Sequence, residues 1–482
     1  MAAAGPGVLA DPGSRRGRLR PPLAQCAPMI STAMTLTDGR FVVPANRWDL
    51  VAGNPLRPAS VAVVIPHYEQ PRQLAMVVRA LELQDHPAEL VEVVVADDGS
   101  RVAPVVAGSS LDVTVLRQED LGFRAAAARN LGAAATSAEL LCFLDADTIP
   151  EPSYVRNLVR LASILPDAVS VGRRRHADLT DWTPDMLESW WCGVARPPVL
   201  TEPEWLTHAY AVSADLLNAD ERSYRHVISA VMCCSRTLFD DIGGFDETFR
   251  EYGGEDWEFA HRAVVNGAVL HHARDAVAWH DGPDWSDRQV TDRTTVKNRE
   301  ALTLARLIPD PLARVSGLRY AVPNVAIEID VDSHSIGSLV TTMGGFLHED
   351  VGIWLRGAAA ARLLDELGTD DPRIRTGPIP EFVVRRCHLR VSTVGRPALP
   401  APAFSDLLRR CSTQGVGEVR TVGGDAGLVI QASWVLNRRR RWTEGAVQFS
   451  CAEDAERLGV VVEVPAATVG LSSLPPDVDL SW

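Results

Sequence analysis

The strongest candidate for a chemical function in this chain is an apolar run that ends in two carboxylates. The run Leu140–Leu144 stops at Asp145 and Asp147, and Pro150 follows. A buried strand that ends there presents both carboxylates at its carboxyl end, where open α/β sheets bind ligands. With period-2 geometry the two carboxylates share one face and repel unless a cation lies between them. The pattern favours a divalent metal that carries a phosphorylated ligand, and the alternative is an Asp-rich turn closed by Pro150.

Three further polar groups lie at the ends of predicted elements. Asp97 and Asp98 follow a strand, Glu255 and Asp256 open a helix, and His280 ends a strand. Acidic residues are common in the first turn of a helix, and a strand-end histidine can simply be hydrogen bonded. A Gly-Gly pair before Glu255 permits close approach of a substrate. Neighbouring carboxylates raise one of the two pKa values, which suits proton abstraction near neutral pH.

These groups need a sheet to position them, and the surrounding sequence alternates short apolar runs with amphipathic stretches. The expected strands are Val61–Ile65, Val91–Val95, Val113–Leu116, Leu140–Leu144, Val227–Cys234 and Ala276–His280. The expected helices cover Leu74–Leu81, Arg124–Ala135 and Glu255–Asn266. We expect Asp120 to cap the second of these helices. The alternation predicts a doubly wound, mostly parallel α/β sheet with right-handed crossovers.

Two segments are each open to two interpretations. The basic run Asn437–Arg441 is predicted to be a solvated charged face, with a phosphate or anionic-polymer contact as the alternative. A polar, Pro-containing stretch from 180 to 223 is rich in aromatic residues. These form either a stacking surface for a sugar ring or the core of an excursion packed on the sheet: Trp182, Trp190, Trp191, Trp205 and Tyr210.

The pattern divides the chain into three parts. Residues 1–55 are expected to be an N-terminal tail, partly disordered, and residues 56–310 to form the domain that carries the candidate site. Residues 321–482 are expected to form a smaller C-terminal α/β domain without catalytic chemistry. The strand Val325–Asp330, for example, has no Gly-Gly-Glu-Asp helix start or strand-end histidine to complete a site around it.

The composition excludes several classes of protein. The chain has 482 residues, is 46% hydrophobic and has a net charge of −14, which argues for a globular protein and against a nucleic-acid binder. No apolar run approaches about 18 residues, so no transmembrane segment is expected. The eight cysteines have no metal-ligand spacing and are interpreted as reduced thiols, which predicts a cytoplasmic protein.

Five motifs occur in the order found in family 2 glycosyltransferases of GT-A fold, and the chain resembles that family over roughly residues 60–300. Three further segments are similar to the bacterial chondroitin-polymerase-like branch: Gln118–Gly132, Ala278–His280 and Thr291–Arg293. The five motifs are Val64–Glu69, Val95–Ser100, Phe143–Asp147, Gly243–Glu247 and Gly253–Trp257.

The resemblance implies an inverting transfer of a sugar from a nucleotide-sugar, with a UDP-sugar expected, to a hydroxyl acceptor. The acceptor is a glycan, a lipid-linked glycan, a peptide or a small molecule. A divalent metal, Mn²⁺ or Mg²⁺, is expected on Asp147 and His280, and Asp145 is expected to contact the ribose or the metal's water shell. Asp256 is the expected general base, and Glu255 either tunes it or binds an acceptor hydroxyl.

By the same resemblance, the ends of the first two strands form the nucleoside pocket, where one aspartate accepts a hydrogen bond from uracil N3–H. Arg124 and Arg129 lie five residues apart and do not share a tight helix face. One of them is expected to contact the diphosphate or uracil, and the other to be structural. The pocket residues are Pro66, His67, Tyr68, Glu69, Asp97 and Asp98.

Two other functions remain as alternatives. A sugar nucleotidyltransferase could share the sheet and the metal, but it would need a Gly-rich, basic phosphate loop after the first strand. Pro66–Gln70 stands there instead. A non-catalytic nucleotide-sugar or glycan-binding protein would not need the combined set of carboxylates and histidine, and that set argues against it.

Overall fold

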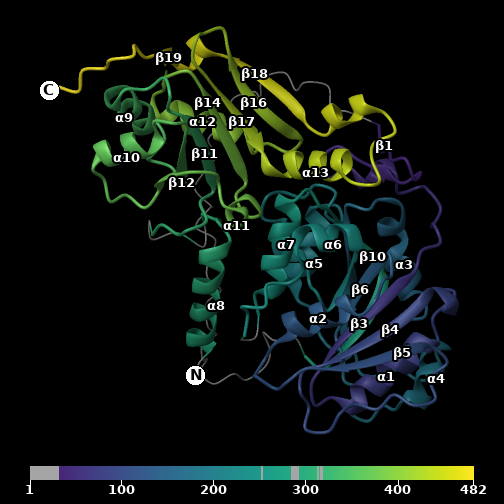
Figure 1. Ribbon diagram of the computed structural model, residues 1–482. Coiled ribbons are helices and arrows are strands. Elements are labelled where there is room, and N and C mark those ends of the chain that lie inside the picture. The colour runs from purple at the N-terminus through teal and green to yellow at the C-terminus, as the bar shows by residue number, and fades with distance from the viewer. Residues whose placement is uncertain (1–31, 251–252, 284–292, 312–313, 315–317, 482) are drawn as a thin grey trace, which may run out of the picture.

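The computed structural model describes residues 32–250, 253–283, 293–311, 314 and 318–481 of the chain. These residues form two units, each built on a large sheet with its own hydrophobic core. The helix α8 (Arg293–Leu307) lies in the chain between the two units, beside the first (Figure 1). Among the described residues, no helix is both long enough and apolar enough to span a bilayer.

The first sheet has the strand order β5-β4-β3-β6-β9-β8-β10-β7. Strands β3, β4, β5 and β6 are parallel to one another, as are β8 and β10, whereas β9 and β7 run antiparallel to their neighbours. The predicted mostly parallel α/β sheet is therefore confirmed. Its strands are β3 (Val61–His67), β4 (Val91–Asp97), β5 (Asp112–Arg117), β6 (Leu140–Leu144), β7 (Thr148–Pro150), β8 (Ala168–Ala177), β9 (Val231–Ser235) and β10 (Val269–Asp281).

Helices cover both faces of this sheet because its central strands are apolar on both sides. Two local expectations are wrong. Strand β9 begins at Val231 rather than Val227, and Asp120 does not cap α2, since its carboxylate accepts from Gly122 N of its own loop (3.1 Å). The helices are α1 (Pro71–Glu82), α2 (Ala125–Ala134), α3 (Tyr154–Ile164), α4 (Leu187–Trp191), α5 (Glu204–Val212), α6 (Arg236–Ile242) and α7 (Glu255–Val265).

The second sheet has the order β13-β12-β11-β14-β17-β16-β18 and combines parallel with antiparallel pairs. Its strands are β11 (Val325–Asp330), β12 (Val351–Arg356), β13 (Ile374–Thr376), β14 (Leu389–Val394), β16 (Val416–Val422), β17 (Gly427–Ala432) and β18 (Val460–Pro465). Its helices are α9 (Ile336–Gly344), α10 (Ala360–Leu367), α11 (Glu381–Val384), α12 (Ala401–Cys411) and α13 (Ser433–Glu444). The smaller α/β unit expected after the first is thus present.

A short hairpin and a short antiparallel strand pair complete the described structure. Strands β1 (Met34–Thr35) and β2 (Phe41–Val42) pair with each other, as do β15 (Pro397–Ala398) and β19 (Ser472–Ser473). The β1–β2 hairpin, which follows the undescribed residues 1–31, packs its apolar side chains against Trp442 of α13. The β1–β2 hairpin is therefore joined to the second unit.

The basic run Asn437–Arg441 is not a solvated face. It lies on α13, which runs along the boundary between the units, above α7 (Figure 1). Arg438 is 1% exposed and Arg441 is 7% exposed. The prediction failed because the partners of the run lie in the other unit, far away in the sequence.

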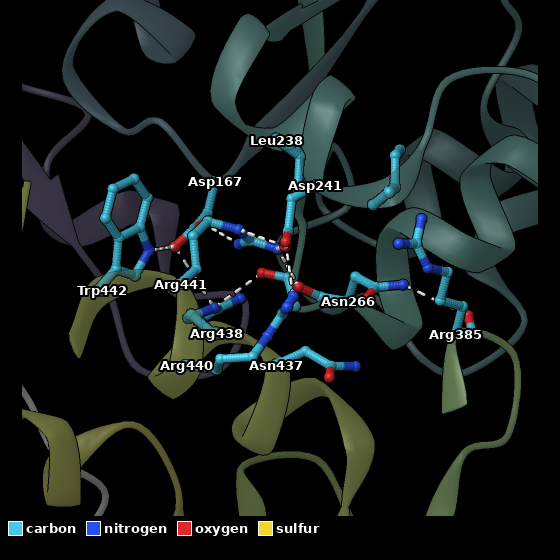
Figure 2. Close-up of polar contacts among 12 residues, drawn as sticks. Asp167, Leu238, Asp241, Asn266, Arg385, Asn437, Arg438, Arg440, Arg441 and Trp442 are labelled. Carbon is cyan, nitrogen blue, oxygen red and sulfur yellow. Dashed lines mark hydrogen bonds and ion pairs between the residues drawn. The ribbon is translucent and has the colours of Figure 1, made fainter. Parts of the chain in front are cut away.

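Figure 2 shows the acidic partners of this run. Arg441 donates to the carboxylates of Asp167 and Asp241, which lie in the first unit. Arg440 also donates to Asp241 (2.6 Å), and Trp442 Nε1 donates to Asp167 Oδ2 (2.9 Å). Asp167 is fully buried. The run thus holds the two units together through paired charges.

The aromatic stretch proves to be mostly core. Trp182, Trp190 and Tyr210 are buried, and Trp190 packs on Trp279 of β10 with a ring-centroid separation of 5.4 Å. Trp205 alone of the five is largely exposed. The excursion therefore packs on the sheet and does not offer a continuous stacking surface.

Candidate active site

The two carboxylates after β6 lie in a turn rather than on a strand. Strand β6 ends at Leu144, and the backbone N–H of Thr148 donates to the carbonyl of Asp145 (3.0 Å) to close the turn before β7. The period-2 argument for Asp145 and Asp147 is therefore wrong. Both side chains are nevertheless partly exposed, at 33% and 22%, near the carboxyl ends of β3 and β6.

A buried arginine joins this turn to the start of α7. Arg129, in the middle of α2, donates to Asp145 Oδ1 (2.9 Å) and to Glu255 Oε1 (3.1 Å). Its side chain is only 4% exposed, and its guanidinium lies 5.4 Å from the ring centroid of Phe245. One cation thus links two of the predicted site carboxylates.

Asp256 follows a backbone turn that only glycine adopts easily. Gly253 and Gly254 have φ angles of +96° and +93°, and α7 begins at the next residue. A Cβ atom on Gly254 would lie 3.1 Å from the Phe249 ring, so the turn is also tight. Burial, and secondly the charge of Glu255, raise the pKa of Asp256 to about 7. Arg129 opposes this shift, so the three groups are electrostatically one unit.

Asp147 and His280 fit a divalent cation. His280 Nδ1 donates to the carbonyl of Gly282 (3.1 Å), which leaves Nε2 as the nitrogen with an electron pair in the neutral ring. Nε2 lies 3.7 Å from Asp147 Oδ2, a separation that a cation with bonds of about 2.0–2.2 Å can bridge. A backbone carbonyl on the other ring nitrogen is the usual support for a metal-binding histidine.

Within the part of the chain that the structure describes, no group of three or more Asp, Glu, His or Cys residues could hold a metal ion. Asp147 also accepts from Gln70 Nε2 (3.2 Å). Asp145 is engaged by Arg129 and is not brought to His280 by any contact. Two protein ligands plus phosphate oxygens and water are an ordinary set for Mg²⁺ and similar ions.

In the predicted nucleoside pocket, Asp97 and Asp98 have different environments. Asp97 is fully buried and accepts from His67 Nδ1 (2.9 Å), Ser100 N (3.1 Å) and Ser100 Oγ (2.5 Å). Asp98 accepts from Gln118 Nε2 (2.6 Å) and Arg124 N (2.8 Å), and burial raises its pKa. Asp97 therefore holds its own loop together, whereas Asp98 joins the loop after β4 to Gln118 and to the start of α2.

The other pocket residues lie around the end of β3. Pro66 pairs within the sheet and is half-buried, whereas Tyr68 is 47% exposed. Glu69 has a φ of +53° and accepts from Arg101 N (2.6 Å). Because Tyr68 is exposed, its ring can contact a ligand at the carboxyl edge of the sheet.

Arg124 and Arg129 point to different partners. Arg124 caps the start of α2 and lies 3.6 Å from Asp98, while Arg129 serves Asp145 and Glu255. The structure therefore brings Arg124 to the nucleoside side of the site and Arg129 to the side of α7.

Sequence reasoning missed four residues that belong to this environment. Gln70 and Ser100 contact predicted site residues, and Gln118 binds Asp98. Arg174 of β8 is close enough to Asp256 for its charge to lower the pKa of that carboxyl. Ser100 and Gln118 lay inside segments already singled out, Gln70 directly followed Glu69 of the predicted pocket, and the three consecutive arginines at 173–175 were the one signal for Arg174.

Two family models match the chain. Residues 62–210 match glycosyl transferase family 2, and residues 212–275 match the model described as the N-terminal domain of galactosyltransferase. The two matches run from β3 to the first half of β10, and this region includes every predicted site residue except His280.

Among curated proteins, the chain is 27% identical to the chondroitin synthase of Escherichia coli over 266 residues, which cover 52% of this chain and 38% of that protein. It is 28% identical to the validoxylamine A glucosyltransferase of Streptomyces hygroscopicus subsp. limoneus over 363 residues, which cover 70% of this chain and 73% of that protein. The chain spans only 26–38% of the chondroitin and hyaluronan synthases that it matches.

Among solved structures, GalNAc-T7 with UDP, GalNAc and Mn²⁺ has a TM-score of 0.37 and 16% identity, and the match covers 54% of this chain and 49% of that one. The sequence matches are the stronger finding, and they agree with the α/β sheet and with the order of the five motifs. Residues 62–210 thus carry a glycosyl transferase family 2 domain, the chain is similar to the chondroitin synthases, and its first unit is a glycosyltransferase domain.

Proposed function

We propose that the protein is a metal-dependent, inverting glycosyltransferase that moves a sugar from a UDP-sugar to a hydroxyl acceptor. The observation that carries this proposal is the double ion pair of Arg129 with Asp145 and Glu255. Through it, the turn expected to face the diphosphate and the helix that begins with the expected base are held as one rigid unit. A transferase must hold the donor and the acceptor in the correct relative position at the same time.

Asp256 is the general base in this mechanism. Its carboxylate takes the proton of the acceptor hydroxyl while the hydroxyl oxygen forms a bond to the anomeric carbon of the donor. The bond from that carbon to the phosphate oxygen breaks, and the configuration inverts. A pKa of about 7 makes Asp256 a stronger base than an ordinary aspartate and still leaves much of it ionised at neutral pH.

Asp147 and His280 would hold the divalent cation, Mn²⁺ or Mg²⁺, which when bound supplies Lewis-acid stabilisation of the departing diphosphate. Gln70 orients the Asp147 carboxylate by donating to it. Asp145 is kept in place by Arg129 and remains partly exposed, so it can contact the ribose.

The nucleoside is proposed to lie between Tyr68 and Asp98. The exposed ring of Tyr68 offers a stacking face for uracil, and Asp98 can accept from uracil N3–H because a carboxylate has about four acceptor positions. Asp98 is preferred to Asp97 for this role because Asp97 is completely buried and accepts three hydrogen bonds from His67 and Ser100, whereas Asp98 is 6% exposed and accepts two.

The acceptor remains a hydroxyl compound of unassigned class. Relatives named for chondroitin and for validoxylamine A leave both a glycan and a small molecule as candidates. The expected cytoplasmic location also stays a prediction.

The test is the release of UDP from a panel of UDP-sugars in the presence of Mn²⁺ or Mg²⁺, with GDP- and dTDP-sugars as controls. We expect metal-dependent release with at least one UDP-sugar, and loss of that release in Asp256→Asn. Pyrophosphate formation from UTP and a sugar phosphate would instead indicate a nucleotidyltransferase. Nucleotide-sugar binding without turnover, under conditions with candidate acceptors, would indicate a binding protein.

A further inference from the structure

A cavity of about 460 Å³ lies between the two units, away from the candidate active site. Val264 and Val265, at the end of α7, form part of its wall. Asp256 stands at the beginning of the same helix, and at 1.5 Å per residue the two positions are roughly 13 Å apart along its axis. The size falls within the usual range of ligand sites. The cavity is therefore separate from the residues that carry out the proposed reaction.

The walls of the cavity combine an apolar floor with a polar rim. Leu270 and the half-buried Trp434 provide apolar and aromatic surface from the two units. Asn218, Thr413 and Gln414 are exposed at the rim and offer amide and hydroxyl groups. A ligand with an apolar face and a ring of hydroxyl groups matches this arrangement, because aromatic rings pack on the first and polar side chains bind the second.

The charges around the cavity argue against an anionic ligand. Arg438 donates to three backbone carbonyl oxygens and is 1% exposed, and Arg222 lies 3.5 Å from Asp310. Both cations that line the cavity are therefore already engaged. Asp220 and Glu221 add negative charge to the rim. A phosphate or a nucleotide would meet carboxylates without a guanidinium to neutralise it.

His388, which also lines the cavity, carries an unsatisfied acceptor. Its Nδ1 donates to Asn324 Oδ1 (2.8 Å), and burial lowers its pKa to about 4, so the ring is neutral at pH 7. Nε2 is buried and has no hydrogen-bond partner among the described residues. A buried acceptor of this kind is costly unless a donor reaches it. Because Nε2 is also shielded from solvent, His388 contributes to the wall of the cavity and does not provide a polar contact for a ligand.

We propose that this interunit cavity is a second saccharide-binding site, which takes a neutral sugar and performs no chemistry on it. The apolar floor packs against the face of the sugar ring, and the polar side chains of the rim bind its hydroxyl groups. Because both units contribute walls, the ligand also stabilises their association. The site would hold a glycan that the enzyme uses or makes, separately from the nucleotide-sugar.

The test is binding of the full-length protein to an array of neutral and uronate-containing oligosaccharides, without UDP-sugar or metal, followed by calorimetry on the best neutral probe. Ala219→Trp fills the cavity, and Ala211→Trp, at an exposed position of α5 outside the lining, is the matched control. We expect neutral glycans to bind the wild type, Ala211→Trp and Asp256→Asn alike. Ala219→Trp should bind at least about tenfold more weakly, which corresponds to about 1.4 kcal/mol.

Three results would overturn the proposal: no neutral glycan bound by the wild type, a preference for uronate-containing glycans, or equal binding by the two tryptophan variants. If Ala219→Trp does not fold by circular dichroism, Gln414→Ala on the exposed rim replaces it, and unchanged affinity there contradicts the site. UDP release is measured in parallel on every variant. If the wild type releases UDP but binds no neutral glycan, only this second site is refuted. If the wild type releases no UDP from any UDP-sugar, the proposed function is refuted.

Discussion

The two units both place a pair of aspartates after a central parallel strand, yet the pairs differ in their surroundings. After β6, Asp145 is bound by the buried Arg129 and Asp147 lies 3.7 Å from His280. After β11, Asp330 accepts from the backbone N–H of Asp332 (3.1 Å), which in turn accepts from the backbone of the loop after β12 (3.0 Å). Both aspartates of the second pair are exposed.

The difference shows that the spacing of two carboxylates predicts a functional site less well than the presence of a cation or histidine beside them. Asp330 and Asp332 form no ion pair with any residue that the structure describes, and each accepts a hydrogen bond from a nearby backbone N–H. The buried guanidinium of Arg129 instead forms ion pairs with two carboxylates from separate elements. Such buried ion pairs are favourable only when their geometry is good. A strand-end aspartate pair is thus chemically interesting when a buried cation or a histidine converges on it.

The largest expected effect is that of removing the base. Asp256→Asn should lower the transfer rate by ~10²–10⁴-fold, because the acceptor proton loses its carboxylate. Affinity for the nucleotide-sugar should stay within a few fold, since no proposed nucleotide contact involves Asp256. Steady-state rates and calorimetry with UDP measure the two effects. If the folded mutant turns over as fast as the wild type, Asp256 is not the base, and the first unit loses the catalytic residue that distinguishes it from the second.

The metal ligands should come next. His280→Ala and Asp147→Ala should each weaken metal-dependent UDP binding by more than about tenfold, because two protein ligands leave little redundancy. A chelator should abolish transfer, and added Mn²⁺ or Mg²⁺ should restore it. Full turnover after chelation would refute the metal, and a silent His280→Ala would mean that the ring is only hydrogen bonded.

The pH dependence should follow the ionisation of Asp256. The base acts in its ionised form, so a pKa raised to about 7 means that the rate rises with pH up to about 7 and levels off above it. Below that value the rate should fall about tenfold per pH unit. A profile of kcat/KM between pH 5 and 9 measures this, and a rate that is flat from pH 5 to 8 would contradict the raised pKa.

Arg129→Met tests the link between the two carboxylates. Loss of the positive charge should raise the pKa of Asp256 further and move the midpoint of the pH profile upward, since Arg129 now lowers that pKa. It should also lower the free energy of unfolding by about 3 kcal/mol, because two carboxylates lose their partner. Arg129→Lys keeps the charge and should leave the midpoint closer to that of the wild type. A midpoint unmoved in both variants would make Arg129 purely structural.

The predicted strands of the first sheet were identified correctly where a fully buried run fixes the strand, as at β3, β4 and β6. Asp256 could be singled out because a Gly-Gly pair and a helix start are both local signals. The turn at Asp145–Asp147 was misread because a strand pattern does not reveal the residue at which pairing stops.

The remaining errors concern contacts between distant parts of the chain. Arg441 contacts Asp167, 274 residues away, and Arg129 contacts Glu255, 126 residues away. No periodicity within a helix indicates such partners, so the basic run resembled an exposed face. Gln70 was missed for the same reason, because its role comes from Asp147 on another loop, and Ser100 joins Asp97 of its own loop to the backbone of Glu69 on another.

The smallest expected effect completes the comparison. Asp330→Asn with Asp332→Asn should leave the rate of sugar transfer close to that of the wild type, because both carboxylates are exposed and accept only from nearby backbone groups. An asparagine keeps an acceptor oxygen for those turns, so stability should change by less than about 0.5 kcal/mol. The matched control is Asp145→Asn with Asp147→Asn after β6, which should be severely impaired. UDP release by the two double mutants, both shown to be folded by circular dichroism, gives the contrast directly. A collapse of rate in the β11 variant would mean that the second unit carries chemistry of its own.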